Sequence, residues 1–232
     1  MSILAAEGRV NGALITGMPD PNSIALSEAR HMVVRKGLFI DVARLVDSPS
    51  IDAEGVALVT TYRSSGAYFW NSATVGAERV RLVDNYLIGA GGYVTANGAP
   101  PLDATIRGNI VDGADFLYAV TTLTPGSSID NNVYRRADPN TLAVTVGGGD
   151  IPFAEWRARG WDGNSVDGDP RWQSGRPSAS NPNFQLASGS PAMGRVTSPI
   201  VQSEIDGYLA RPRTLDQARD YLLYRAPMYV VA

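Results

Sequence analysis

The stretch Ile106-Arg107-Gly108-Asn109-Ile110-Val111 has a counterpart near the start of the chain, Val10-Asn11-Gly12-Ala13-Leu14-Ile15. Between these two copies the pattern recurs in steps of 24, 24, 24, 24 and 23 residues, along a column formed by Ala13, Gly37, Thr61, Asn85, Asn109 and Asn132. Three places before each member stands an aliphatic residue: Val10, Val34, Leu58, Leu82, Ile106 and Ile129. A fixed period of about 20–50 residues is typical of solenoids, propellers and arrays.

The apolar groups inside each repeat are short, which favours strands over helices. Groups such as Leu38-Phe39-Ile40 and Tyr86-Leu87-Ile88 are rich in β-branched and aromatic residues and are bounded by Gly, Asn, Asp or Ser. A repeat of this length accommodates three short strands and three turns at roughly 3.3 Å per residue. We therefore predict an all-β chain in which about six coils stack in parallel register, each covering the strand edges of the next.

The column itself has a predicted structural role. Asn tolerates the left-handed backbone conformation that a sharp turn needs. Stacked Asn side chains also hydrogen-bond from one layer to the next, as they do in cross-β stacks. We expect Asn85, Asn109 and Asn132 to form such a ladder inside the molecule.

The repeat stops before residue 149, and a different organisation follows. We predict a helix over Pro152–Arg159 with Asp150 as its N-cap, and a second helix that starts at the cap Thr214 and includes Leu223. Residues 173–183 are a loop by composition. Trp156, Trp161 and Trp172 are expected in the core of this cap. Residues 1–148 then hold the coils and residues 149–232 the cap and tail, within one structural domain.

Several motifs of this closing part follow one another in a recognisable order: Phe153-Ala154-Glu155-Trp156, Gly160-Trp161-Asp162-Gly163-Asn164-Ser165, Asp169-Pro170, Asn183-Phe184-Gln185-Leu186 and Gly189-Ser190-Pro191-Ala192-Met193-Gly194. The series resembles the closing segment of many secreted and phage-borne proteins of the right-handed parallel β-helix superfamily, the pectate-lyase-like fold. With the repeat, the resemblance covers nearly the whole chain. It implies a right-handed parallel β-helix solenoid with a C-terminal cap that contains short helices.

The end of the chain departs from that family. The family often finishes with an Asp-x-x-Gly-x-x-Arg-Pro stretch and then Asp-Ile-Gly-Ala-x-Glu. Asp206-Gly207 and Arg211-Pro212-Arg213 match the first part only, and residues 218–232 do not match the second. Related lyases often use calcium held by carboxylates, with Lys or Arg as the base. The resemblance therefore allows calcium, but the sequence has no calcium-binding signature.

Composition limits the other classes of function. The formal net charge of −3 argues against nucleic acid as the main partner, and the sequence contains no apolar run of 18 residues that would span a membrane. The absence of Cys excludes disulfides and thiolate metal sites, and a single His leaves no zinc signature. We predict no metal and no signal peptide in this chain.

Charged residues beside the column are the candidate ligand-binding groups. Asp84, Arg107 and Asp130 stand one or two places before it in successive coils, so we expect Asp84 and Asp130 roughly 10 Å apart with Arg107 between them. Arg and Tyr suit sugar hydroxyls and carboxylates. The full predicted saccharide groove is Arg63, Asp84, Arg107, Asp112, Asp130, Tyr134 and Arg135. The alternative is that these groups make surface ion pairs alone.

Catalysis is the second hypothesis. A glycosidase needs two carboxylates about 5–9.5 Å apart, and Asp84, Asp112 and Asp130 are the candidates. A lyase needs a base beside a uronic acid, and Lys36 is the candidate, with Arg35 and His31 nearby in sequence. Nothing in the spacing shows that any of these groups converge, so the catalytic residues stay unassigned.

The favoured interpretation is a polysaccharide-binding β-helix module of a phage or phage-like particle, a spike or fibre component that attaches to the host surface. We expect it at the virion surface or outside the cell. A polysaccharide lyase or glycoside hydrolase is the alternative, and a purely structural assembly segment is a third. The N-terminal coil and the apolar tail after Tyr221 predict a homo-oligomer, a trimer by resemblance to spikes, or docking on a larger assembly.

Overall fold

The computed structural model describes residues 5–11, 14–18, 24–27, 29–42, 44–60, 67–71, 78–89, 92–96, 101–114, 116–120, 122–136, 144–146 and 149–210. This part of the chain is mostly β, with two short helices. The prediction of a mostly β, parallel chain is confirmed at this level.

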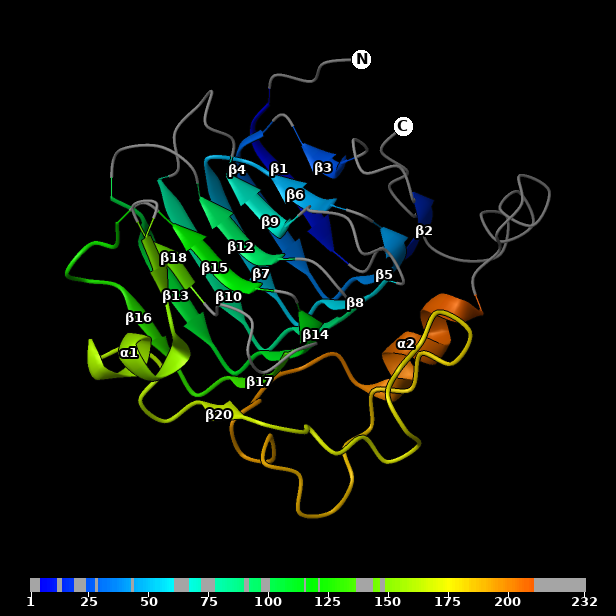
Figure 1. Ribbon diagram of the computed structural model, residues 1–232. Coiled ribbons are helices and arrows are strands. Elements are labelled where there is room, and N and C mark those ends of the chain that lie inside the picture. Colours follow the sequence, from blue (N-terminus) through cyan, green and yellow to red (C-terminus); the bar gives the residue numbers. More distant parts are fainter. Residues whose placement is uncertain are drawn as a thin grey trace.

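Three sheets contain the strands (Figure 1). Sheet A contains β1 (Ala5–Asn11), β4 (Ala29–Arg35), β7 (Ser50–Glu54), β10 (Arg79–Val83), β13 (Asp103–Arg107) and β16 (Ser128–Asp130). Sheet B contains β2 (Leu14–Met18), β5 (Leu38–Val42), β8 (Ala57–Val59), β11 (Tyr86–Ile88), β14 (Ile110–Ala114), β17 (Val133–Arg136) and β20 (Val166–Asp167). Sheet C contains β3 (Ile24–Ser27), β6 (Arg44–Asp47), β9 (Ala67–Asn71), β12 (Gly92–Ala96), β15 (Phe116–Val120), β18 (Val144–Val146) and β19 (Gly149–Ile151).

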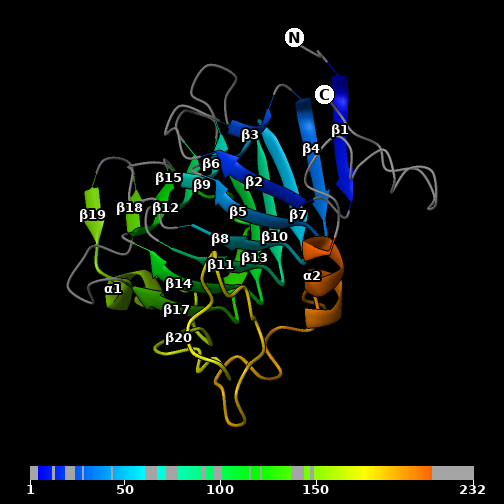
Figure 2. The same ribbon diagram turned by 90° about the vertical axis from the view of Figure 1, so that its right-hand side faces the viewer.

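Each strand from β1 to β15 pairs with the strand three places later in the chain. Three consecutive strands therefore visit sheets A, B and C in turn, and we call each such passage a circuit. The described pairings in sheets A and B are all parallel, whereas β18 and β19 in sheet C pair antiparallel. Figures 1 and 2 show the strands of each sheet lying in order, from blue at the N-terminal end to green.

The register corrects one part of the predicted repeat. Val34 pairs with Ala53, and Ala53 pairs with Leu82, so these two steps are 19 and 29 residues rather than 24 each. Leu58 instead pairs with Phe39 and Leu87 in sheet B. The short step is followed by a long one, so the sequence repeat is back in phase after the two steps. The shift between them therefore cannot be seen in the sequence alone. Val56 takes the column position that we predicted for Thr61, and Thr61 itself lies outside the described residues.

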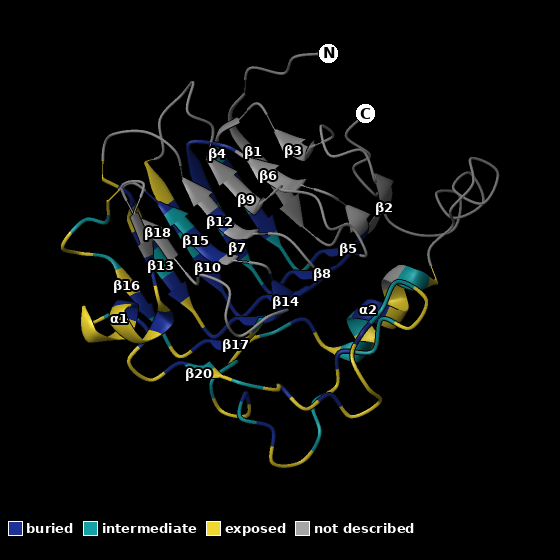
Figure 3. Ribbon diagram, viewed as in Figure 1, coloured by how far each residue is buried: buried dark blue, intermediate teal, exposed yellow. Residues whose placement is uncertain are grey.

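The strands β8, β11 and β14 of sheet B are buried on both faces, which explains their mostly apolar sequences. Residues that alternate along the sheet contribute to two separate apolar clusters. Phe39, Leu58 and Leu87 belong to the cluster between the sheets. Leu38, Tyr86 and Ile110 pack outward against residues 166–209, which we call the C-terminal segment. Figure 3 shows β8 and β14 in dark blue, whereas β20 at the C-terminal end of the sheet is teal and yellow.

The C-terminal segment contributes that outer cover. Tyr86 stacks on Phe184 with ring centroids 5.5 Å apart and meets Trp172 edge-on at 5.7 Å. Helix α1 (Phe153–Ala158) lies within the predicted Pro152–Arg159, but Pro152 rather than Asp150 is its N-cap. Trp156 and Trp172 are buried, and Trp161 packs against the core, as expected. Helix α2 (Gln202–Leu209) was not predicted, and the helix expected after Thr214 lies outside the described residues.

The turn from sheet A to sheet B repeats in every circuit from the second to the sixth. Its first residue has a positive φ each time: Lys36, Gly55, Asp84, Gly108 and Asn131, at 51°, 63°, 56°, 66° and 59°. The left-handed residue thus precedes the Asn column, and none of the column Asn residues has a positive φ, contrary to our expectation. At Gly108 a Cβ atom would also lie 2.2 Å from Oδ1 of Asp84, so glycine is needed there for space as well.

Candidate functional site

The Asn column forms the predicted ladder. Nδ2 of Asn85 donates to Oδ1 of Asn109 at 2.9 Å, and Nδ2 of Asn109 donates to Oδ1 of Asn132 at 3.0 Å. The same two oxygens accept the backbone N–H of Asn85 and Asn109, both at 3.0 Å. All three Asn side chains are fully buried. Their role is to join neighbouring circuits, and none of them faces a ligand.

The ladder ends on the buried carboxylate of Asp162. Oδ1 of this residue accepts from Nδ2 of Asn132 at 3.1 Å and from the Tyr134 hydroxyl at 3.0 Å. Ser165 and Trp156 donate to it as well. Burial raises the pKa of Asp162, and these four hydrogen bonds oppose that shift. Tyr134 therefore points into the core, and its predicted place in a saccharide groove is wrong.

Asp84 is also part of the internal structure. Its side chain is buried, and it accepts hydrogen bonds from the backbone N–H of Thr197 at 3.0 Å and of Ser198 at 2.7 Å. The Thr197 hydroxyl is a third donor, at 2.9 Å. Asp84 follows β10, whereas Arg107 and Asp130 are register partners within the strands, so the predicted row of three does not form.

Lys36 contacts the same C-terminal segment two circuits away. Its Nζ donates to the backbone oxygens of Ser198 at 3.1 Å and Pro199 at 2.6 Å, and lies 3.8 Å from Glu204. Arg195, at the other end, donates to Asn131 in the sixth circuit. Residues 195–199 thus run along the A-to-B turns, and we call them the strap. Lys36 is engaged in fixing the strap rather than placed as a base.

Asp112 is buried on the outer side of sheet B, 1% exposed. Its Oδ2 accepts from Nε1 of Trp172 at 2.7 Å, and its Oδ1 lies 3.1 Å from Nε of Arg176. Arg135 is 3.8 Å from the same oxygen and 3.6 Å from Asp169. Asp112 and Asp130 lie in different sheets, so the carboxylates expected to flank one bond belong to separate clusters.

The outer face of sheet A is the polar surface that remains exposed. Asp52 lies at the centre of an ion-pair network there, 2.7 Å from both Arg35 and Arg81, and Glu54 is 2.9 Å from Arg81. Burial raises the pKa of Asp52, but the hydrogen bonds from Arg35 and Arg81 outweigh it and keep that pKa below its ordinary value. His31 shares a 2.7 Å hydrogen bond with Ser50 on the same face.

Two of the predicted ligand-binding residues, Arg107 and Asp130, lie near the sixth-circuit end of this face. Arg107 is exposed and is the register partner of Asp130 on the neighbouring strand. Asp130 accepts from the backbone N–H and from Nδ2 of Asn164, both at 2.7 Å. Partial burial raises the pKa of Asp130, but these hydrogen bonds, a backbone hydrogen bond from Asn131 and the charge of Arg195 together outweigh it, so the pKa lies below its usual value. Arg63 lies outside the described residues.

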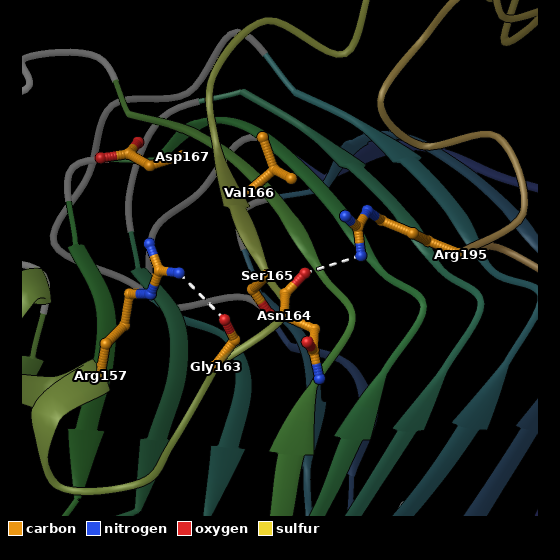
Figure 4. Close-up of a pocket in the computed structure, with 7 residues that line it drawn as sticks. All are labelled: Arg157, Gly163, Asn164, Ser165, Val166, Asp167 and Arg195. Carbon is orange, nitrogen blue, oxygen red and sulfur yellow. Dashed lines mark hydrogen bonds between the residues drawn. The ribbon is translucent and has the colours of Figure 1, made fainter.

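Asn164 also lines an open depression of about 460 Å³. Figure 4 shows its lining, with Arg157 of α1 on one side of residues 163–166 and Arg195 of the strap on the other. Arg157 donates to the backbone oxygen of Gly163 at 2.9 Å, and Arg195 donates to that of Asn164 at 2.6 Å. Sequence reasoning missed both arginines, because only the folding of the cap brings residues 157, 164 and 195 together.

Five arginines have no carboxylate oxygen within 4.0 Å, counted among those whose side chains the structure describes: Arg79, Arg107, Arg157, Arg171 and Arg195. Arg79 and Arg107 lie on the outer face of sheet A, Arg157 and Arg195 line the depression, and Arg171 donates to the backbone oxygen of Gly189. An unpaired guanidinium keeps planar donors available for hydroxyl, carboxylate, sulfate or phosphate groups.

Among the described residues, no group of three or more His, Asp or Glu side chains is arranged to hold a metal ion. Neither helix in the described part has the length and apolar character needed to cross a membrane. Comparison with known proteins gave no further indication: no family model, no curated protein and no solved structure matches this chain.

Proposed function

We propose that the chain is a polysaccharide-binding module built as a right-handed parallel β-helix solenoid. The passage of consecutive strands through three sheets supports the solenoid, and the right-handed sense is the one that parallel crossover connections adopt almost without exception. The outer face of sheet A is the proposed binding surface, because the C-terminal segment covers the outer face of sheet B.

One observation is central to this proposal. The outer face of sheet A presents charged and polar side chains in rows at the strand spacing of about 4.8 Å, including the register pairs Arg79↔Asp103 and Arg107↔Asp130. That spacing is comparable to the length of one sugar residue in an extended chain. The network around Asp52 holds its side chains in place before a ligand arrives, which lowers the entropic cost of binding.

Binding is favoured over cleavage by the positions of the candidate carboxylates. Asp84 and Asp112 are buried and hydrogen-bonded to the C-terminal segment, and Asp130 is held by Asn164. A general acid or base must reach the substrate directly or through one water. A polysaccharide lyase or glycoside hydrolase remains the alternative that the experiment must separate.

The test is a glycan array followed by affinity electrophoresis with the polysaccharides that bind. The double variant Arg79→Ala/Arg107→Ala should bind roughly tenfold more weakly or worse, because each loses hydrogen bonds from a charged donor. Arg159→Ala is the control, since Arg159 is exposed at the C-cap of α1 and paired with Glu155. Unchanged affinity of the double variant would refute the proposed surface. Release of reducing ends or of unsaturated sugars would instead establish the enzymatic alternative.

The proposal includes a setting at the virion surface of a phage or phage-like particle, where a spike or fibre component attaches to the host. It also includes a homo-oligomer, a trimer by resemblance to spikes, assembled through the N-terminal circuit and the C-terminal tail. The tail lies outside the described residues. Light scattering at micromolar concentration tests the assembly: a monomer with no partner would contradict it, and deletion of residues 221–232 should shift an oligomer towards monomer.

A further inference from the structure

We infer that the depression between Arg157 and Arg195 is a subsite for an anionic group on the bound sugar: a carboxylate, sulfate or phosphate. This inference rests on the proposed polysaccharide-binding function and names the chemical class of the ligand. It concerns residues that the proposed surface of sheet A does not include.

The two guanidinium groups that line the depression are held by neutral acceptors. Arg157 uses one terminal nitrogen for Gly163, and its guanidinium carbon lies 6.0 Å from the ring centroid of Phe153 on its own helix. Arg195 donates from Nε to Pro191 and from Nη1 to Asn164 and Asn131. These acceptors are all neutral. Each arginine is therefore fixed in position with no carboxylate oxygen within 4.0 Å among the described residues, and the charge of Arg195 acts only at longer range on Asp130, whose pKa it lowers.

The carboxylates near the depression have partners of their own. Asp167 lines the depression but is 2.6 Å from Arg136, which balances its charge. Asp130 is adjacent; it accepts hydrogen bonds from the neutral groups of Asn164 and from the backbone of Asn131, and it keeps one negative charge that Arg195 attracts. Arg136 balances the charge of Asp167, so Arg157 and Arg195 leave two positive charges against the single negative charge of Asp130. The local field therefore favours an anion, although the net charge of the chain is −3.

The depression lies beside the end of the proposed surface that carries Arg107. Asn164 lines it and also holds Asp130, the register partner of Arg107 at the edge of the proposed surface. A sugar chain lying along the outer face of sheet A reaches the depression after passing Arg107. Its anionic substituent then meets fixed guanidinium donors that need no reorganisation, and charge-assisted hydrogen bonds of this kind are about twice as strong as neutral ones.

The test uses substitutions that remove the charge. The Gln side chain is two atoms shorter than Arg, so Arg157→Gln and Arg195→Gln lose both the charge and the hydrogen bond from Nη to the backbone oxygen of Gly163 or Asn164, and a control must lose a bond of the same kind. Arg171→Gln is the matched control, because Arg171 also donates to a backbone oxygen, that of Gly189, and lies outside the depression. Thermal melting of all three variants shows whether the fold is intact.

The ligands form matched pairs: polygalacturonate with its carboxyl-reduced form, and dextran sulfate with dextran. We expect wild-type protein to bind an acidic member more tightly than its neutral partner, and each depression variant to lose roughly tenfold in affinity for that acidic member. Affinity for the neutral partner should not change. The pair that responds distinguishes a carboxylate from a sulfate ligand, and added inorganic phosphate tests phosphate by competition.

Two results would overturn the inference, and they differ from each other. Equal binding of acidic and neutral polymers, with no effect of either Gln variant, would leave polysaccharide binding intact and remove the anionic subsite. No binding of any polymer, here or on the glycan array, would remove the proposed function and the subsite with it.

Discussion

The ammonium group of Lys36 donates a 2.6 Å hydrogen bond to the backbone oxygen of Pro199, joining the second circuit to a segment 163 residues later. Asp84, in the fourth circuit, accepts hydrogen bonds from the backbone of Thr197 and Ser198. Arg195 donates a hydrogen bond to Asn131, in the sixth circuit. The strap therefore connects circuits that have no direct strand pairing with one another. Its contacts lead to the first prediction.

Asp84→Asn should destabilise the protein by roughly 1–3 kcal/mol, because hydrogen bonds that a charged acceptor makes are stronger than neutral ones. Asp103→Asn, exposed on the outer face of sheet A, should change stability by less than about 0.5 kcal/mol. Urea unfolding measures both. Hydrogen exchange at the Thr197 and Ser198 amides should speed up only in the Asp84 variant, and unchanged protection there would contradict the anchoring role.

Ile106→Asp should abolish folding, and Leu82→Asp should do the same. Both side chains are buried between the sheets, and an unpaired charge there costs several kcal/mol against a total stability of about 5–15 kcal/mol. Thr105→Asp, one residue earlier on the outer face of the same strand, is the control and should fold. A cooperative melt of soluble Ile106→Asp protein would show that the inward column is misassigned.

Asn109→Ala should lower the free energy of unfolding by roughly 1–3 kcal/mol. The variant removes the acceptor for the side-chain NH₂ of Asn85 and the donor to the backbone oxygen of Leu82. Arg107→Ala, on the exposed side of the same turn, should cost little. Chemical denaturation of the two variants gives the comparison. Similar small losses in both would mean that the ladder contributes nothing to stability.

Acid should weaken the network around Asp52. The pKa of Asp52 is lower in the folded protein than its ordinary value of 3.8, so the unfolded chain takes up the proton first as the pH falls. The stability that this carboxylate contributes is thus present above about pH 4 and is lost on further acidification. The gap in unfolding free energy between wild type and Asp52→Asn should narrow below that pH. A constant gap would refute the ion-pair account.

The sequence predicts the parallel strands and the Asn ladder because both depend on a local pattern that recurs at a nearly fixed step. It misplaces Leu58 and Thr61 because a 19-residue step followed by a 29-residue step leaves the later alignment unchanged. Only the pairing of Ala53 with both Val34 and Leu82 reveals the shift. A period shows how many circuits fit, but backbone pairing decides which residues face each other.

The candidate site was less predictable, because it depends on what the cap covers. Asp84 and Asp112 have the positions expected of surface groups in a bare coil, and they are buried by residues from 172 to 198. Tyr134 instead faces inward, because it is the register partner of Val111 and belongs to the cluster between the sheets. Arg157 and Arg195 give no signal in sequence, since their shared neighbour, residues 163–165, is 6 to 32 positions away from them. Polar residues beside a repeat are best judged only after the irregular segments have been placed.

The ladder has a single sense of direction. A carboxylate can only accept, so Asn132 turns its NH₂ group towards Asp162 and its oxygen towards Asn109, and Asn109 and Asn85 follow in the same sense. The backbone holds this sense at every step, because each side-chain NH₂ also donates to a carbonyl oxygen and each side-chain oxygen also accepts a backbone N–H. The two ends are therefore not interchangeable: a layer inserted between two Asn-bearing circuits could extend the row unchanged, whereas a layer stacked upside down would meet oxygen with oxygen. The length of this molecule can vary in whole circuits while its polarity cannot.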